Sequence, residues 1–211
     1  MKRCFIPFKC QSAEQVVGEN TNKKKLILVI AVLVFGVVSI VAGIGTMTNA
    51  GGGGVKYEKY SSAEYGFSVN YPQNWIERTG SGAAVYYNAP PLKLTSTSSW
   101  NDPASFNVQI PAPAGGMTLN QLVDESKLAV ENMFPGISFT NEKDVQVNGI
   151  KGHEWMVVVD NFSGSGVNAT MMEDFFIAND KVYVITFMAI SEYYGDYAGT
   201  FDAILNSFTV P

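Results

Sequence analysis

The stretch Gly66–Gly80, GFSVNYPQNWIERTG, is the segment of the chain that says most about its fold. Apolar and polar residues alternate from Phe67 to Tyr71, which is the pattern of a β-strand that buries one face. Pro72 lacks a backbone N–H and ends the strand. The segment therefore predicts a half-buried strand followed by a turn, after which Trp75 packs into the interior.

Strand patterns continue on both sides of this segment. Two tight-turn signals, Asn148-Gly149 and Asn179-Asp180, separate β-rich runs and indicate hairpins. The run that begins at Lys181 is apolar on both faces, so we expect it to lie centrally in the sheet. The predicted strands cover residues 56–61, 66–72, 83–88, 105–111, 144–147, 152–160, 169–178 and 181–189.

Two segments have helical periodicity instead. Thr118 and Gln121 form a capping box, and the apolar stripe that follows ends at Phe134-Pro135-Gly136. A second stripe runs from Tyr194 to Phe208. Each helix has one apolar face, which requires one contact with the sheet. The predicted fold class is α+β: an antiparallel sheet flanked by helices on both faces, as an α/β/α sandwich, preceded by one transmembrane helix.

An uncharged apolar block precedes the domain. Leu26–Ile44 would form a helix of roughly 28 Å, enough to cross a bilayer. Lys23–Lys25 lie before it, and no charge follows it until Lys56, which places the N-terminus in the cytoplasm. A signal peptide cleaved after Ala50 is the alternative. We expect a single-pass protein of the cell membrane, with a cytoplasmic basic head at 1–25, a bilayer-spanning helix at 26–45, a Gly-rich linker at 46–55 and an extracytoplasmic domain at 56–211.

Charge and cysteine content differ between the two ends of the chain. Residues 1–54 have six Lys or Arg and two Glu, a net charge of +4, whereas residues 55–211 have eight and seventeen, a net charge of −9. The acidic balance disfavours nucleic acid as a partner. Cys4 and Cys10 lie in the head, where the reducing compartment disfavours a disulfide. An unstructured head, S-acylation and metal binding are the three interpretations of this pair.

The phrase YGFSVNYPQNW, residues 65–75, resembles the start of PsbP-like domains, in which an early strand carries Phe, then Tyr-Pro, then a Trp under the sheet. The ending FDAILNSFTV, residues 201–210, is similar to the closing helix of the same family. The order of strands and helices agrees between these two motifs. The resemblance covers about Lys56 to Pro211, and it rests on short and mainly structural motifs.

This resemblance implies an α/β/α sandwich that the related DcrB and Mog proteins share while doing different things. It also implies a non-enzymatic accessory role, as in PsbP, which supports assembly of a photosynthetic complex and its retention of calcium and chloride. Two departures count against transferring that specific role. The domain is acidic where docking of the plant protein is attributed to basic residues, and a membrane helix replaces the lumenal N-terminal extension.

Few residues of the outer domain suggest catalysis. His153 is its only histidine, no cysteine is present, and no G-x-S-x-G motif occurs, so we expect no enzyme activity. We expect His153 on the solvent face of a strand. His153, Glu173 and Asp174 are weak candidates for calcium or another divalent ion, although alternation sends His153 and Glu154 to opposite faces. No cofactor is expected.

Asn161-Phe-Ser and Asn168-Ala-Thr are N-glycosylation sequons in or near one loop on the side that we expect to face outward. Their use depends on whether the host modifies its surface proteins.

Aromatic residues at strand ends and loops, which we expect to be exposed, are the remaining indication of function. Tyr86, Tyr87, Trp100 and Tyr193 are candidate partner contacts, because interfaces favour Tyr and Trp. We expect a non-catalytic binding or assembly accessory module with a membrane or envelope protein as partner. The alternative is an envelope protein that binds a small ligand or a divalent ion.

Overall fold

The computed structural model describes residues 55–78, 83–91 and 102–211. The predicted basic head, the predicted membrane helix at 26–45 and the linker up to residue 54 lie outside these ranges. Neither of the α-helices within them has the length and apolar character of a membrane span.

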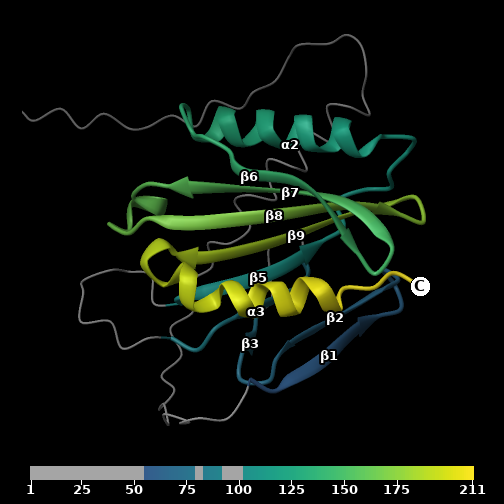
Figure 1. The fold of residues 1–211 in the computed structure, drawn as a ribbon, viewed down its shortest axis with the longest axis horizontal. Helices are drawn as coiled ribbons and strands as arrows, with labels where there is room; N and C mark the ends of the chain where they lie inside the picture. The colour runs from purple at the N-terminus through teal and green to yellow at the C-terminus, as the bar shows by residue number, and fades with distance from the viewer. Residues whose placement is uncertain (1–54, 79–82, 92–101) are drawn as a thin grey trace, which may run out of the picture.

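The centre of the domain is a sheet of seven antiparallel strands (Figure 1). The predicted central strand, β9 (Lys181–Ile190), is the middle strand of this sheet, with three strands on each side of it. Nine of its ten residues are buried, as its apolar pattern predicted. In spatial order the strands are β3 (Ile76–Glu77), β4 (Ala83–Asn88), β5 (Ala104–Gln109), β9 (Lys181–Ile190), β8 (Ala169–Ala178), β7 (Ile150–Val159) and β6 (Thr140–Val147).

The first two strands form a sheet of their own, which corrects the expectation of a single sheet. β1 (Tyr57–Ser62) pairs with β2 (Phe67–Pro72) in antiparallel register. On its other side β2 meets the C-terminal tail, where the backbones of Ser68 and Thr209 exchange two hydrogen bonds of 2.9 Å. The strand predicted from the opening motif is therefore confirmed, but it joins a hairpin beside the main sheet.

Two α-helices cover opposite faces of the main sheet (Figure 1). Helix α2 (Leu119–Met133) begins with the predicted capping box, in which the backbone N–H of Thr118 donates to Gln121 Oε1 at 2.9 Å. Helix α3 (Tyr194–Ser207) follows the 3-10 turn η2 (Ser191–Tyr193), and a further 3-10 turn, η1 (Phe162–Gly164), lies between β7 and β8.

Strand alternation divides the interior into two cores. On β8, Phe175 packs in the core under α2, and its neighbour Phe176 packs in the core under α3. Both rings are fully buried. The α3 core also contains Phe67 and Trp75, so the tryptophan of the opening motif packs where the sequence predicted.

Local turn chemistry is confirmed at both predicted hairpins. Asn148 and Gly149 have φ values of 49° and 86°, and Asn179 and Asp180 have φ values of 50° and 57°. Positive φ at both central positions gives a turn whose twist matches that of the flanking strands. The edge strand β6 begins at Thr140, four residues before the predicted start, because a register shift between Thr140 and Lys143 hides its alternation.

Candidate functional site

An open pocket of about 400 Å³ lies between the turn after β2 and the first turns of α3. We call it the aromatic pocket, because three of its lining residues are aromatic and two are prolines. Its principal lining residues are Pro72, Trp75, Pro90, Tyr193, Asp196 and Tyr197. Val55, Asn74 and Thr200 complete the lining.

Trp75 holds one wall of the pocket in place. Its backbone N–H donates to Pro72 O at 2.9 Å and closes the turn that the proline starts. The indole ring is 7% exposed and meets Phe106 at 5.9 Å and Phe201 at 6.4 Å between ring centroids. The rings are tilted by 46° in the contact with Phe106 and meet edge to face at 90° in the contact with Phe201, and such aromatic contacts add stability beyond burial alone. The small exposed part of Trp75 that lines the pocket is therefore held in place by the packing of its ring in the core.

The opposite wall comes from the start of α3. Tyr193 is the last residue of η2 and the N-cap of α3, and Tyr197 lies in the first turn of that helix. Tyr197 meets Trp75 at 6.1 Å with an interplanar angle of 70°, and burial raises the pKa of its hydroxyl. Asp196 is exposed beside them in the first helical turn.

Apolar and aromatic side chains make up most of the pocket lining. Asp196 is the one charged side chain among the lining residues, and they include no histidine, cysteine, serine or lysine within the described ranges. Val55, which lines the pocket, is 56% exposed. Ile76, which follows Trp75 in the chain, is 39% exposed, and Tyr57, which pairs with Pro72, is 37% exposed. Such a surface is typical of a site that another molecule covers.

The predicted aromatic contacts have different outcomes. Tyr193 lines the aromatic pocket, whereas Trp100 lies outside the described residues. Tyr86 is half-buried beside the side chains of Asn88 and Ser105, and burial raises the pKa of its hydroxyl. The expectation that Tyr87 is exposed is wrong. Its ring is 4% exposed and stacks on the ring of Tyr71 at 4.0 Å, because alternation turns it into the α3 core.

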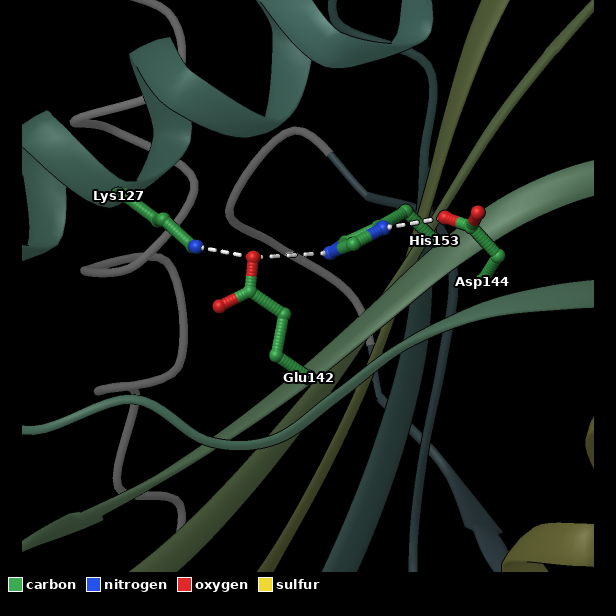
Figure 2. A network of polar contacts seen from close by, with 4 residues as sticks. All are labelled: Lys127, Glu142, Asp144 and His153. Atoms are coloured by element: carbon green, nitrogen blue, oxygen red, sulfur yellow. Dashed lines mark hydrogen bonds and ion pairs between the residues drawn. The ribbon is translucent and has the colours of Figure 1, made fainter.

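His153 lies in a polar network between α2 and the edge of the sheet (Figure 2). Its Nδ1 is 2.9 Å from Asp144 Oδ1, and its Nε2 is 3.3 Å from Glu142 Oε1. Lys127 of α2 pairs with the same oxygen of Glu142. The His153 side chain is 17% exposed and shares the α2 face with Trp155, so the expectation of a solvent-facing histidine is wrong.

This network, which we call the α2 clasp, links a helix to two strands. Both imidazole nitrogens face carboxylates, which leaves neither directed at a substrate. Hydrogen bonding to Lys127 is the main cause that lowers the pKa of Glu142, and His153 adds to it. The clasp therefore has a structural role: it ties α2 to β6 and β7.

Replacing Glu142 with glutamine is expected to lower the free energy of unfolding by about 0.5–1 kcal/mol at low salt, because exposed ion pairs contribute little. The loss should shrink at high salt through screening. Since the pKa of Glu142 is lowered in the folded state, this stabilisation is present above its ordinary value of 4.5 and is lost below it. Urea unfolding at two salt concentrations measures the effect. An equal loss at both would contradict an electrostatic clasp.

The two carboxylates proposed as weak metal candidates lie on opposite faces of β8. Glu173 faces α2 and accepts a hydrogen bond of 3.2 Å from Thr186 Oγ1, and burial raises its pKa to about 7. Asp174 faces α3 and is fully buried. Burial and the neighbouring Glu154 raise the pKa of Asp174 well above its usual range. Glu154 itself pairs with Lys143 at 2.8 Å.

The structure does not bring the three metal candidates together. His153 and Glu173 share a face, and Asp174 lies on the other. Within the described ranges, no group of three or more His, Cys, Asp or Glu is placed to hold a metal ion. The expected weak binding of calcium or another divalent ion thus finds no common site in these side chains.

Both sequon asparagines are exposed in the connection between β7 and β8. Asn161 has a left-handed backbone with φ of 46°, and its side-chain oxygen accepts a hydrogen bond from Gly166 N at 2.8 Å. Asn168 Oδ1 accepts from the backbone N–H of Asn161 at 3.0 Å. Both side-chain oxygens therefore accept hydrogen bonds from backbone N–H groups of the loop, and glycosylation stays a prediction.

A row of buried polar side chains on the α2 face of the sheet was not anticipated. Its pattern in the sequence is the alternation of polar residues with Phe106 and Val108 on β5, which sequence reasoning assigns to a solvent face. Asn107 Oδ1 has no hydrogen-bond partner among the described residues. The row consists of Asn88, Ser105, Asn107, Gln109, Thr186 and Glu173, all at most 4% exposed.

Comparison with known proteins identifies the family to which the chain belongs. The family model described as PsbP-like protein matches residues 25–210. The chain therefore belongs to the PsbP-like protein family. A search of curated proteins found no significant match.

Solved structures share the fold at low sequence identity. Cyanobacterial PsbP (CyanoP) from Synechocystis sp. PCC 6803 aligns with a TM-score of 0.54 and 18% identity, covering 78% of this chain and 98% of that one. LpqN of Mycobacterium tuberculosis, described as involved in cell envelope biogenesis, gives 0.51 and 11%, covering 75% and 93%. The Ran-binding protein Mog1p of Saccharomyces cerevisiae gives 0.50 and 10%, covering 74% and 96%. At these identities the likeness concerns the fold alone.

Proposed function

We propose that this protein is a non-catalytic binding or assembly module, anchored in the cell membrane by residues 26–45, with its PsbP-like domain outside the cytoplasm. Its partner docks on the aromatic pocket and is a protein of the same membrane or envelope. The observation that carries the proposal is the pocket itself, an aromatic and proline-lined hollow of about 400 Å³ surrounded by exposed apolar side chains.

The position of the pocket relative to the anchor supports a partner in the same membrane. Val55, the first described residue, lies on the pocket rim. The nine residues from 46 to 54 span at most about 30 Å when fully extended. The pocket would therefore stay close to the bilayer, within reach of the short outer segments of a membrane protein. The family match begins at residue 25, so the apolar block is part of what the chain shares with its family.

The descriptions of two structural neighbours are compatible with such a role. Mog1p is described as a Ran-binding protein, and LpqN as involved in cell envelope biogenesis. These descriptions belong to those proteins. For this chain, the composition of the pocket supports binding, because aromatic and proline rings supply contact area at low entropic cost.

Site-specific photo-crosslinking in the native membrane tests the proposal. A photoreactive residue is placed at Asn74 or Thr200 on the pocket rim of the full-length protein, and at Asp124 on the exposed face of α2 as the control. We expect a discrete adduct with one partner from the two rim positions, and much less of it from position 124. Mass spectrometry identifies the partner.

Two results would contradict the proposal. One is the absence of any adduct from both rim positions in membranes where the protein is intact. The other is an equal yield from position 124, which would show that the partner does not contact the pocket in preference to the exposed face of α2.

A further inference from the structure

We infer that the aromatic pocket accepts an extended, proline-rich protein segment that carries a lysine or arginine. This inference rests on the proposed function and names the chemistry of the docking partner. Three features of the pocket support it: fixed aromatic walls, two prolines that lack a backbone N–H, and an acidic side chain at the rim.

The pocket walls are preorganised aromatic surfaces. Trp75 and Tyr197 meet edge to face, and both rings contact Phe201, which is fully buried. The walls therefore hold their orientation before a ligand arrives. Proline rings pack against fixed aromatic walls of this kind, and a polyproline II segment is already extended, so little conformational entropy is lost on binding.

The two prolines in the lining argue against an added β-strand. Strand addition needs a row of free backbone N–H and C=O groups, and neither Pro72 nor Pro90 has an N–H to donate. A docked helix is disfavoured for a different reason. With its side chains a helix is roughly 10–12 Å across and needs a long apolar groove, whereas this pocket has a volume of about 400 Å³ and is lined by nine residues. The remaining mode of recognition is packing of the aromatic walls against a narrow, extended segment.

The charge of the pocket selects a basic segment. Asp196 is exposed at the rim, and Glu192 precedes it in the adjacent turn. Residues 55–211 have a net charge of −9, so the surrounding field also attracts cations. Asn74 and Thr200 on the rim supply hydrogen-bonding groups for the carbonyl oxygens of an extended chain.

Calorimetric titration of the full-length protein in detergent tests this inference. The probe is a decaproline peptide with two arginines at one end, and the control peptide replaces the prolines with alternating glycine and serine. We expect measurable binding of the proline peptide, and at least about tenfold weaker binding of the control peptide.

Variants assign the binding to the pocket. Tyr197→Ala should weaken the proline peptide about tenfold, since it removes one wall. Asn74→Arg, at an exposed rim position, should weaken it through repulsion without touching the core. Asp196→Asn should weaken it roughly two- to fivefold and reduce its salt dependence. The matched control is Asp124→Asn, which removes one exposed helical carboxylate on α2 and should leave binding unchanged.

Two outcomes would overturn the inference: no binding of the proline peptide, or binding that Tyr197→Ala and Asn74→Arg both leave unchanged. Neither outcome decides the proposed function, because crosslinking from the pocket rim measures docking of any partner. If a partner is crosslinked at the rim but the proline peptide does not bind, the pocket is still the docking site, and its specificity for proline is rejected.

Discussion

Replacing Glu173 with glutamine is expected to stabilise the protein more at pH 8 than at pH 4, by about 3 kcal/mol. Burial raises the pKa of Glu173 from 4.5 to about 7, so the folded state holds its proton more tightly than the unfolded state does. The wild-type protein therefore loses stability as the pH rises from about 4.5 to about 7, and glutamine removes this loss.

Urea unfolding of the full-length wild-type and variant proteins at several pH values measures the difference in free energy of unfolding. Glu131→Gln, at an exposed position of α2, controls for the removal of one acidic residue. Other titrating groups are common to all three proteins and cancel in the comparison. A difference between wild type and Glu173→Gln that stays constant from pH 4 to pH 8 would show that Glu173 is not buried as described.

Replacing Gly152 with alanine is expected to destabilise the protein by about 2–3 kcal/mol, since a well-packed interior accommodates no added methyl group without strain. A Cβ at this position would lie 2.4 Å from Phe176 Cε1 and 2.7 Å from Phe175 O. The Phe176 ring is fully buried and the second atom belongs to the backbone, so neither moves aside cheaply. Thermal and urea unfolding measure the loss.

Gly199→Ala is the matched control for this substitution. Gly199 lies in α3 with no atom within 4 Å of its added Cβ, and its φ is not positive. Alanine there should stabilise the helix by about 0.5–1 kcal/mol. Opposite signs for the two Gly→Ala changes are the expected result. A stabilising or neutral Gly152→Ala would mean that β7 and β8 are farther apart than the structure places them.

The aromatic pocket was partly accessible from the sequence. Tyr193 was identified as a candidate contact, and Trp75 was expected beneath a sheet. Neither Pro90 nor Asp196 was singled out, because nothing near them in the sequence marks a site. Tyr87 was misjudged as exposed since strand alternation identifies two faces without saying which layer covers each one.

The same limit of strand alternation, which separates two faces without showing what covers them, applies to the buried carboxylates. Glu173 and Asp174 are adjacent in the sequence, and alternation alone places them on opposite faces. That both faces are covered, so that burial raises both pKa values, follows only from the packing of a helix on each side. Their role in a shared metal site was plausible from proximity in sequence, and the geometry of the sheet separates them.

The sequence by itself determined the local structure: the capping box of α2, the two asparagine-led turns, the strand alternation and the central place of β9. These features depend on residues within a few positions of one another, whose propensities act wherever the chain folds. The tertiary structure alone decided that β1 and β2 form a separate sheet, and that segments near residues 72, 90 and 197 meet in one pocket. Contacts between distant segments depend on how all the apolar stripes are buried together, which no single stretch of sequence encodes.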